Sequence, residues 1–335
     1  MPATPRYDVA ALGNAIVDVI ASADDAFLID QQLTKGSMQL IDEARATALY
    51  AAMAPAVETS GGSAANTCAG VASLGGRAAY VGKVAADQLG EVFAHDIRAG
   101  GVHFDVPPLT DGPATGRSMI NVTPDAQRTM CTFLGAANQL TPGDVDEALI
   151  GDAAVTFLEG YLFDPAEARR AFNKAAEAAH RAGRLVAITL SDAFVVERWR
   201  DDLLAFLPRL DIVLANEAEI AALYRTEDFD AALGQLASAV KIAAATRGEA
   251  GSVIAAGSDR HTIAAEPVAQ LVDTTGAGDQ YAAGVLLGVA RGMPLADCGR
   301  LGSIAAAEVI DHVGPRPRRP LRALASAAGL RLPDA

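Results

Sequence analysis

The chain has 335 residues, 51% of them hydrophobic, which is enough for one large α/β domain or two smaller ones. Its net charge of −14 and its 5% aromatic content argue against a nucleic-acid-binding surface and against adhesion to an anionic membrane. The N-terminus carries no apolar or basic leader, and no apolar run approaches the ~20 residues of a membrane-spanning helix. We therefore expect a soluble, cytoplasmic protein.

Cysteine and histidine usage adds two exclusions. The three cysteines, Cys68, Cys131 and Cys298, are odd in number and show no C-x-x-C spacing, so we expect reduced, buried thiols. The five histidines have no H-x-x-H or H-E-x-x-H spacing, which argues against a zinc site.

The first part of the chain predicts short, mixed elements. An apolar run over 7–12 predicts a buried strand that ends at the turn Gly13-Asn14, and short alternating pieces follow over 15–41. Helices are expected at 42–53, 64–74 and 88–99, and strands at 78–84, 117–122 and 128–134. The turn Thr123-Pro124-Asp125-Ala126 joins the last two strands.

The pattern becomes regular after residue 140. Strands are expected near 153–158, 185–190, 211–215, 240–245 and 252–256, and helices near 165–182, 195–207, 217–224, 229–238, 278–291 and 300–311. Alternating strands and helices imply a parallel sheet with helices on both faces. The prolines at 315, 317 and 320 are expected to end regular structure.

A glycine-rich turn precedes the predicted helix at 278–291. Its amides would lie at the positive end of the helix dipole, where anions bind, and Gly276, Ala277 and Gly278 leave room for phosphate oxygens. Asp279, at the mouth of the same helix, is placed to accept the proton of an attacking hydroxyl during phosphoryl transfer. The alternative is that Asp279 only caps the helix.

Two other nucleotide-binding motifs are missing. The P-loop pattern G-x-x-x-x-G-K-[ST] does not occur, and G-x-G-x-x-G fails because Tyr281 stands where its last glycine would be. A nicotinamide-dependent dehydrogenase is therefore disfavoured.

Two segments resemble the signatures of the ribokinase-like (PfkB) carbohydrate and nucleoside kinases. Residues 273–279, DTTGAGD, resemble the C-terminal signature. Residues 60–67, SGGSAANT, resemble the start of the N-terminal signature. The resemblance continues at Leu74-Gly75, Gly82-Lys83-Val84, Asp87 and Gly90. The similarity extends from Tyr7 to about Pro317. It implies a three-layer α/β fold with a mainly parallel central sheet, helices on both faces and a small β lid.

The resemblance also implies the domain organisation. We expect a single ribokinase-like domain over 1–335, with lid segments at approximately 15–41 and 113–135 inserted in the α/β core. An exposed lid sheet is able to pair with a second subunit, so both a monomer and a homodimer are compatible with the sequence.

Residues 13–18, GNAIVD, resemble the start of the adenosine kinases within this family. The resemblance implies that Asn14 and Asp18 meet a ribose, and a carboxylate accepts well from both hydroxyls of a cis-diol. Gly62, Ser63 and Asn66 would lie beside the same sugar. The alternatives are a simple turn at 13–14 and a capping role for Asp18.

An apolar slot for a base is expected from Leu134, Phe133, Tyr161 and Phe163. Ordinary core packing of these side chains is the alternative.

The expected nucleotide site draws on several strand ends. Asn216 and Glu219 resemble the family's N-x-x-E element, which implies contact with Mg²⁺ and phosphate through water, and a helix capping box is compatible with that role. Thr246 and Gly248 resemble the T-x-G of the ATP site, with a surface turn as the alternative. The resemblance further implies that Ser191 lines the channel and that Ser303 lies by the adenine of ATP.

The resemblance also implies a monovalent-cation site. The expected positions are matched by Asp273 and Thr275 and by the backbone near Gly314. A requirement for K⁺, in addition to ATP and Mg²⁺, is therefore compatible with the sequence.

These residues together predict an ATP-dependent kinase that phosphorylates the primary hydroxyl of a ribose-containing small molecule, with adenosine to AMP as the leading reaction. The alternatives within the family are kinases of ribose, fructose or a ketodeoxy sugar acid, and of inosine or guanosine. A nucleoside-binding protein without catalysis is the alternative from a different class, and the intact turn at 276–279 argues against it.

Overall fold

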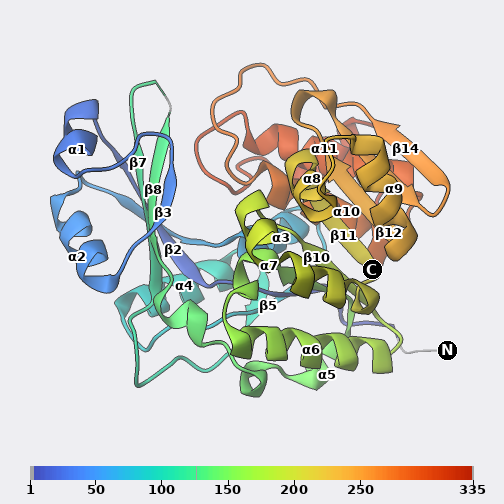
Figure 1. Cartoon of the computed structure of the whole chain (residues 1–335), viewed down its shortest axis with the longest axis horizontal. Helices are drawn as coiled ribbons and strands as arrows, with labels where there is room; N and C mark the ends of the chain where they lie inside the picture. Colours follow the sequence, from blue (N-terminus) through green and yellow to red (C-terminus); the bar gives the residue numbers. More distant parts are fainter. Residues whose placement is uncertain (1–3, 126, 334–335) are drawn as a thin grey trace.

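The computed structural model describes residues 4–125 and 127–333, so Ala126 of the predicted turn lies outside the described residues. Figure 1 shows a large α/β body and, beside it, a smaller sheet flanked by two helices.

A nine-stranded sheet forms the middle layer of the body. Its strands run in the order β14-β13-β12-β11-β10-β9-β1-β5-β6. Their bounds are β1 (Tyr7–Leu12), β5 (Ala78–Val81), β6 (Val102–Phe104), β9 (Ala153–Glu159), β10 (Leu185–Thr189), β11 (Ile212–Asn216), β12 (Ile242–Thr246), β13 (Ser252–Ala256) and β14 (Asp259–Ile263). The pairs from β12 to β6 are parallel, and β13 and β14 add an antiparallel edge. The predicted mainly parallel sheet is confirmed.

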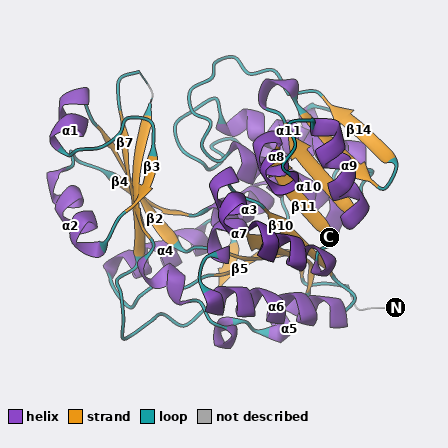
Figure 2. Ribbon diagram, in the orientation of Figure 1, coloured by secondary structure: helices purple, strands orange, loops and turns teal. Residues whose placement is uncertain are grey.

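Helices cover both faces of this sheet (Figure 2). One buried cluster joins the sheet to α6 (Ala166–Arg181), α7 (Ala193–Phe206), α8 (Glu217–Tyr224) and α9 (Phe229–Ala239), and α5 (Glu147–Gly151) flanks α6. The other joins it to α3 (Ser63–Ser73), α4 (Gln88–Ala99), α10 (Ala277–Ala290), α11 (Leu295–Val309) and α12 (Leu321–Ala327). Neighbouring residues of β1 belong to opposite clusters, because successive side chains of a strand point to opposite faces.

The second sheet has five strands in the order β3-β8-β7-β2-β4. They are β3 (Met38–Leu40), β8 (Arg128–Phe133), β7 (Gly116–Val122), β2 (Ile16–Ser22) and β4 (Val57–Gly61), and α1 (Asp25–Asp30) and α2 (Glu43–Ala52) belong to the same part. A small apolar cluster, including Leu28, Leu49 and Cys131, packs these helices on the sheet. The predicted segments 15–41 and 113–135 contain every strand of this sheet except β4, which is short and has only its last two residues buried.

Two helix boundaries differ from the prediction. A helix follows Pro320, which was expected to stop regular structure, and α11 begins at Leu295 rather than near 300. Both helices have proline as the residue before the first turn, where its missing N–H is not needed by the helix. The prolines therefore start these helices.

The chain direction across the large sheet locates a binding crevice. β1 lies inside the sheet, β5 and β6 follow it on one side, and β9 to β12 follow on the other. In open parallel sheets such a switch of direction leaves a crevice at the carboxyl ends of the strands. Asn14, Glu159, Ser191, Asn216 and Thr246 all lie at or just after those ends.

Candidate active site

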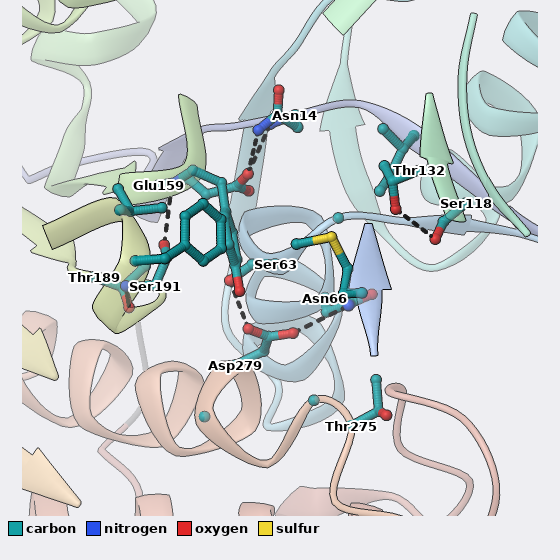
Figure 3. Close-up of a pocket in the computed structure, with 18 of the residues that line it drawn as sticks. Asn14, Ser63, Asn66, Ser118, Thr132, Glu159, Thr189, Ser191, Thr275 and Asp279 are labelled. Carbon is teal, nitrogen blue, oxygen red and sulfur yellow. Dashed lines mark hydrogen bonds between the residues drawn. The ribbon is translucent and has the colours of Figure 1, made fainter. Parts of the chain in front are cut away.

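A cavity of about 420 Å³ lies between the carboxyl ends of the large sheet and one face of the second sheet. Figure 3 shows Asp279 in it, with the second-sheet residues Ser118 and Thr132 on one side and Thr189 and Ser191 on the other. The cavity thus joins the start of α10 to both sheets.

Asp279 lies in the first turn of α10, but it is not the residue that caps the helix. The cap is Gly276, whose φ of 81° is left-handed and whose Cα faces Pro315 so closely that a Cβ would overlap it. The Asp279 carboxylate accepts instead from Ser63 Oγ at 2.6 Å and from Asn66 Nδ2 at 3.1 Å (Figure 3). The capping alternative for Asp279 is therefore wrong.

The first turn of α10 also offers free amides. No acceptor for the backbone N–H groups of Gly278 or Asp279 occurs within the described part of the chain. Such groups at a helix start bind anions. Burial raises the pKa of the Asp279 carboxyl, while hydrogen bonds from Ser63 and Asn66 and the charge of Arg316 lower it. A carboxylate with a raised pKa takes up a proton more readily than an ordinary aspartate.

Glu159 is a site residue that sequence reasoning missed. At the end of β9, it accepts from the Asn14 amide at 3.2 Å, from Asn14 Nδ2 at 2.8 Å and from the Ala64 amide at 2.8 Å. Burial raises the pKa of Glu159 to about 7, against these hydrogen bonds. The only sequence signal was an acidic residue directly after the apolar run 153–158.

Asn14 is oriented by Glu159 and keeps an unused acceptor. Its Oδ1 is buried without a hydrogen-bond partner in the described residues, and Asn14 lines the cavity. A buried polar atom without a partner is costly unless a ligand pairs with it. Gly62, which begins α3 with φ 95°, lies against the Asn14 carbonyl, where a Cβ would overlap the oxygen.

Asp18 reaches the cavity from β2 of the second sheet and is only 6% exposed. Burial raises the pKa of Asp18 to about 7, the charges of Arg316 and Arg128 lower it, and Asp279 raises it further. The absence of a Cβ at Gly61 leaves room for this carboxylate. The cavity that contains Asp279 is thus also lined by all the residues predicted to meet the ribose: Asn14, Asp18, Gly62, Ser63 and Asn66.

Two arginines that sequence reasoning did not single out are in contact with site residues. Arg316 donates from Nε to Asn66 Oδ1 at 3.2 Å and forms an ion pair with Asp96 at 3.1 Å. Arg128, at the start of β8, forms an ion pair with Asp273 and so links the second sheet to the glycine-rich turn. The intervals in sequence are too long for a local pattern to have revealed any of these three contacts.

The residues expected at a monovalent-cation site lie close together. Asp273 accepts from the Thr275 amide at 3.0 Å and from the Gly314 amide at 2.9 Å. Binding of K⁺ there stays a prediction.

Asn216 and Glu219 form the capping box of α8. Asn216 Nδ2 donates to Glu219 Oε1 at 2.6 Å, the Asn216 amide donates to Oε2 at 3.0 Å, and the Glu219 amide returns a bond to Asn216 Oδ1 at 2.9 Å. Burial, with the nearby charge of Asp192, raises the pKa of Glu219 to about 7.

This geometry fits a hydrated Mg²⁺ better than a directly bound one. Both Glu219 oxygens already accept hydrogen bonds, and no group of three or more acidic, histidine or cysteine side chains able to hold a metal occurs among the described residues. Mg²⁺ usually keeps several waters and takes most other ligands from phosphates. Asn216 and Glu219 would then contact its water shell.

Only some of the other residues predicted to contact ATP line the cavity. Thr246 and Ser191 line the cavity, and Ser191 has a left-handed φ of 70° and accepts from the Tyr161 amide at 3.2 Å. Gly248 and Ser303 are not among the described residues that line the cavity, and Ser303 is buried in α11. Contacts of all four with ATP stay predictions.

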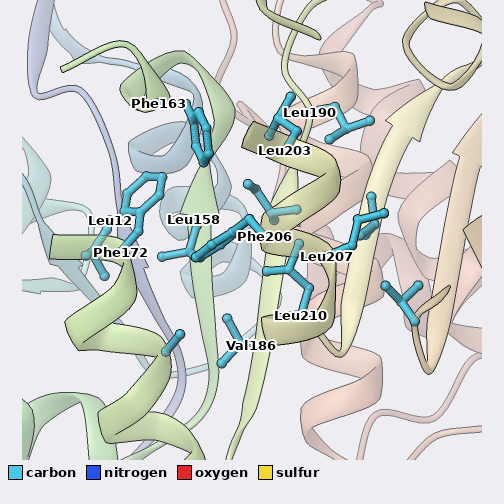
Figure 4. Packing of buried hydrophobic residues seen from close by; sticks show 14 of the residues in the cluster. Leu12, Leu158, Phe163, Phe172, Val186, Leu190, Leu203, Phe206, Leu207 and Leu210 are labelled. Atoms are coloured by element: carbon cyan, nitrogen blue, oxygen red, sulfur yellow. The ribbon is translucent and has the colours of Figure 1, made fainter. Parts of the chain in front are cut away.

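The predicted apolar slot is partly wrong. Leu134 and Tyr161 line the cavity, but Phe163 packs in the core against Phe172 and Phe206, as Figure 4 shows. Phe133 packs in the cluster beneath the second sheet, because it alternates with the cavity-facing Thr132 and Leu134. The apolar lining comes from both sides of the cavity. The second sheet contributes Ile16, Met38, Leu40, Ile120 and Met130, and the body contributes Phe194, Val195, Trp199 and Leu214.

The three cysteines are free and buried, as predicted. Among the described residues, every helix is too short or too polar to cross a bilayer.

Comparison with known proteins gives a family and several relatives. The model of the pfkB family of carbohydrate kinases matches residues 40–321. The adenosine kinase of Saccharomyces cerevisiae is 26% identical over 326 residues, which are 91% of this chain and 95% of that protein.

Two solved structures are more similar. The adenosine kinase from Sinorhizobium meliloti is 54% identical, with a TM-score of 0.90 over 96% of this chain and 99% of that one. A probable sugar kinase from Rhizobium etli is 51% identical, with a TM-score of 0.92 over 98% of this chain and 100% of that one. The fold is therefore ribokinase-like, while these two names differ in the acceptor that they suggest.

Proposed function

The chain belongs to the pfkB family of carbohydrate kinases and is an ATP-dependent kinase acting on an alcohol group, and we propose that its acceptor is the primary hydroxyl of a nucleoside, with adenosine to AMP as the main reaction. The observation that carries the proposal is the position of Asp279. Its carboxylate shares one cavity with the free amides of its own helix turn and with Asp18 and Asn66.

The proposed reaction is an in-line transfer. The acceptor hydroxyl gives its proton to Asp279 as its oxygen bonds the γ-phosphorus, and the bond from that phosphorus to the bridging oxygen of ADP breaks. The free amides of Gly278 and Asp279 stabilise the charge that develops on the transferring group. Asn216 and Glu219 would hold the water shell of Mg²⁺, which would supply further positive charge to the phosphates when bound.

Ribose recognition in this proposal rests on Asp18 and Asn14. The Asp18 carboxylate accepts from the two ring hydroxyls, and the unpaired Asn14 Oδ1 accepts from the acceptor as well. Gly62 and Ser63 let the sugar approach α3. The second sheet acts as a lid that excludes water and limits hydrolysis of ATP.

A nucleoside is favoured over a free sugar by the apolar wall. Met38, Leu40, Ile120, Met130 and Leu134 line the cavity, and such a surface suits a flat base better than a polyol. The second candidate is a sugar kinase for ribose, fructose or a ketodeoxy sugar acid, because one similar structure is named a probable sugar kinase. Inosine and guanosine remain alternative nucleosides. A cytoplasmic monomer or homodimer, with K⁺ as an activator, completes the proposal.

A substrate panel tests this function. Purified protein with ATP and Mg²⁺ is given adenosine, inosine, guanosine, ribose, fructose and a ketodeoxy sugar acid, and ADP release and the phosphorylated product are measured with and without K⁺. We expect the highest kcat/KM for adenosine, with AMP as product. A higher kcat/KM for any free sugar would refute the nucleoside assignment, and ligand binding without ADP release would favour a non-catalytic binder.

A further inference from the structure

Two buried hydroxyls lie in the apolar wall of the cavity. Ser118 and Thr132 are directly opposite on β7 and β8, and Asp18 is opposite Ser118 on β2. Residues directly opposite on neighbouring strands share a face of the sheet. The three side chains therefore form one polar row, Asp18–Ser118–Thr132, and all of them line the cavity.

The hydroxyls bond to each other and have no other partner in the described part of the chain. Ser118 Oγ and Thr132 Oγ1 are 2.9 Å apart, and their residues are only 4% and 8% exposed (Figure 3). Each hydroxyl has one proton to donate and two lone pairs, so the mutual bond leaves one donor and several acceptor sites unused.

The neighbouring rows on this face are apolar. Ile120 and Met130 are opposite one another on one side of the row, and Ile16 and Leu134 line the cavity on the other. A polar pair inside such a surface costs stability unless something in the cavity bonds to it.

The row also has a length that discriminates between acceptors. Adjacent strands lie ~4.8 Å apart, so Thr132 is roughly 10 Å from the backbone of Asp18 across the sheet. A pentose held at Asp18 by its ring hydroxyls is too small to cover both strand intervals. A nucleoside with its ribose at Asp18 carries its base across them.

We propose that the Ser118–Thr132 hydroxyl pair binds the hydrogen-bonding edge of the acceptor's base and determines base specificity. The proposal rests on the nucleoside kinase function above and adds the residues that read the base. Because hydroxyls rotate, the pair donates and accepts, so it accommodates an amino or an oxo group. It disfavours a base whose edge has no polar atom.

Thr132→Val tests the pair, because valine replaces the hydroxyl by a methyl group of similar size. The variant and the wild type are compared by kcat/KM on adenosine and on benzimidazole riboside, whose six-membered ring has no polar edge. We expect a loss of roughly 3- to 10-fold on adenosine, mainly through KM, as for one hydrogen bond. Benzimidazole riboside should be used as well as by the wild type, or better.

Thr129→Val is the matched control. Thr129 lies on the same strand, points to the opposite face and accepts from the Gly36 amide there. We expect this variant to keep the wild-type ratio of kcat/KM for the two nucleosides. Ser118→Ala provides a second test of the pair. We expect the same fall in the ratio of kcat/KM on adenosine to kcat/KM on benzimidazole riboside. This variant decides between the outcomes if Thr132→Val does not fold.

The outcomes separate this inference from the function on which it rests. If wild-type protein phosphorylates nucleosides but the variants of the pair lose equal activity on both probes, or none on either, base reading by the pair is wrong and the nucleoside kinase stands. If wild-type protein phosphorylates only free sugars, the proposed function fails, and the hydroxyl pair fails with it.

Discussion

The carboxylate of Asp279 is controlled by neighbours from distant parts of the chain. Ser63 and Asn66 come from the first turns of α3 and donate to its two oxygens, while Arg316 donates to the amide oxygen of Asn66. Burial raises the pKa of Asp279, and these donors and the arginine charge oppose the rise. The balance leaves a carboxylate that is oriented and able to take a proton, as general-base catalysis requires.

Replacement of this carboxylate tests its role. Asp279→Asn keeps the size of the side chain and removes the proton acceptor, so we expect kcat to fall by roughly 10²–10⁴-fold. The amides at 276–279 remain, so ATP binding, measured by titration calorimetry, should stay within a few-fold of wild type.

Asp297→Asn is the control at the same scale. Asp297 occupies the third position of α11, as Asp279 does in α10, but it does not line the cavity. Its replacement should leave kcat unchanged. Near-normal turnover by Asp279→Asn would contradict the assignment of the base.

At the scale of elements, one carboxylate joins three of them. Glu159 ends β9, orients Asn14 after β1 and accepts from the Ala64 amide in the first turn of α3. A carboxylate near a helix start also interacts favourably with the helix dipole. The junction fixes where the cavity-lining ends of β1 and α3 lie relative to each other.

Removal of Glu159 is expected to weaken both stability and substrate binding. Glu159→Ala leaves buried amide donors of Asn14 and Ala64 without an acceptor, so the free energy of unfolding should fall by about 2–5 kcal/mol. KM for the acceptor should rise, because Asn14 loses its orientation. Urea unfolding followed by circular dichroism, together with steady-state kinetics, measures the two effects.

Glu177→Ala gives the comparison for this prediction. Glu177 lies exposed on α6 and pairs with Arg209 at the surface, so its loss should cost about 0–1 kcal/mol and leave KM unchanged. Equal stability of the two variants would show that the Glu159 junction contributes no more than a surface ion pair.

For the whole molecule, buried carboxyls determine how stability depends on pH. Burial raises the pKa of Asp18, Glu159 and Glu219 to about 7, from 3.8 for an ordinary aspartate and 4.5 for an ordinary glutamate. Between the ordinary pKa values and pH 7, these carboxyls keep protons in the folded state that they have lost in the unfolded state. Stability from these groups is therefore present at low pH and is lost as pH rises through 7. The pKa values are lowered for Asp87, Asp96 and Asp211. Stability from these three groups is lost as pH falls, but only below about pH 4.

We expect the melting temperature of the ligand-free protein to fall between pH 5 and pH 8, by on the order of 5 °C. The net charge of −14 acts in the same direction, because carboxylate repulsion grows with pH. Differential scanning calorimetry at pH 5, 6, 7 and 8 checks this. Glu159→Gln should show a shallower fall, because one titrating group is removed. A melting temperature that rises over the same range would contradict the prediction.

Local patterns in the sequence were enough for the fold class and for the turn at 273–279. Apolar runs, helix periodicity and glycine positions reflect interactions between residues a few positions apart, and these determine strands, helices and turns directly. The same holds for the capping box of Asn216 and Glu219, where both partners lie within one helix turn.

Only the tertiary structure decided which polar groups meet. Asn14 and Glu159 are 145 positions apart, Asn66 and Arg316 are 250 apart, and β4 joins the second sheet without a strong pattern of its own. The same is true of the row formed by Asp18, Ser118 and Thr132, whose members are ordinary strand residues until three strands align in register. Such contacts depend on how helices and sheets pack as whole bodies, and no local interaction along the chain records that packing.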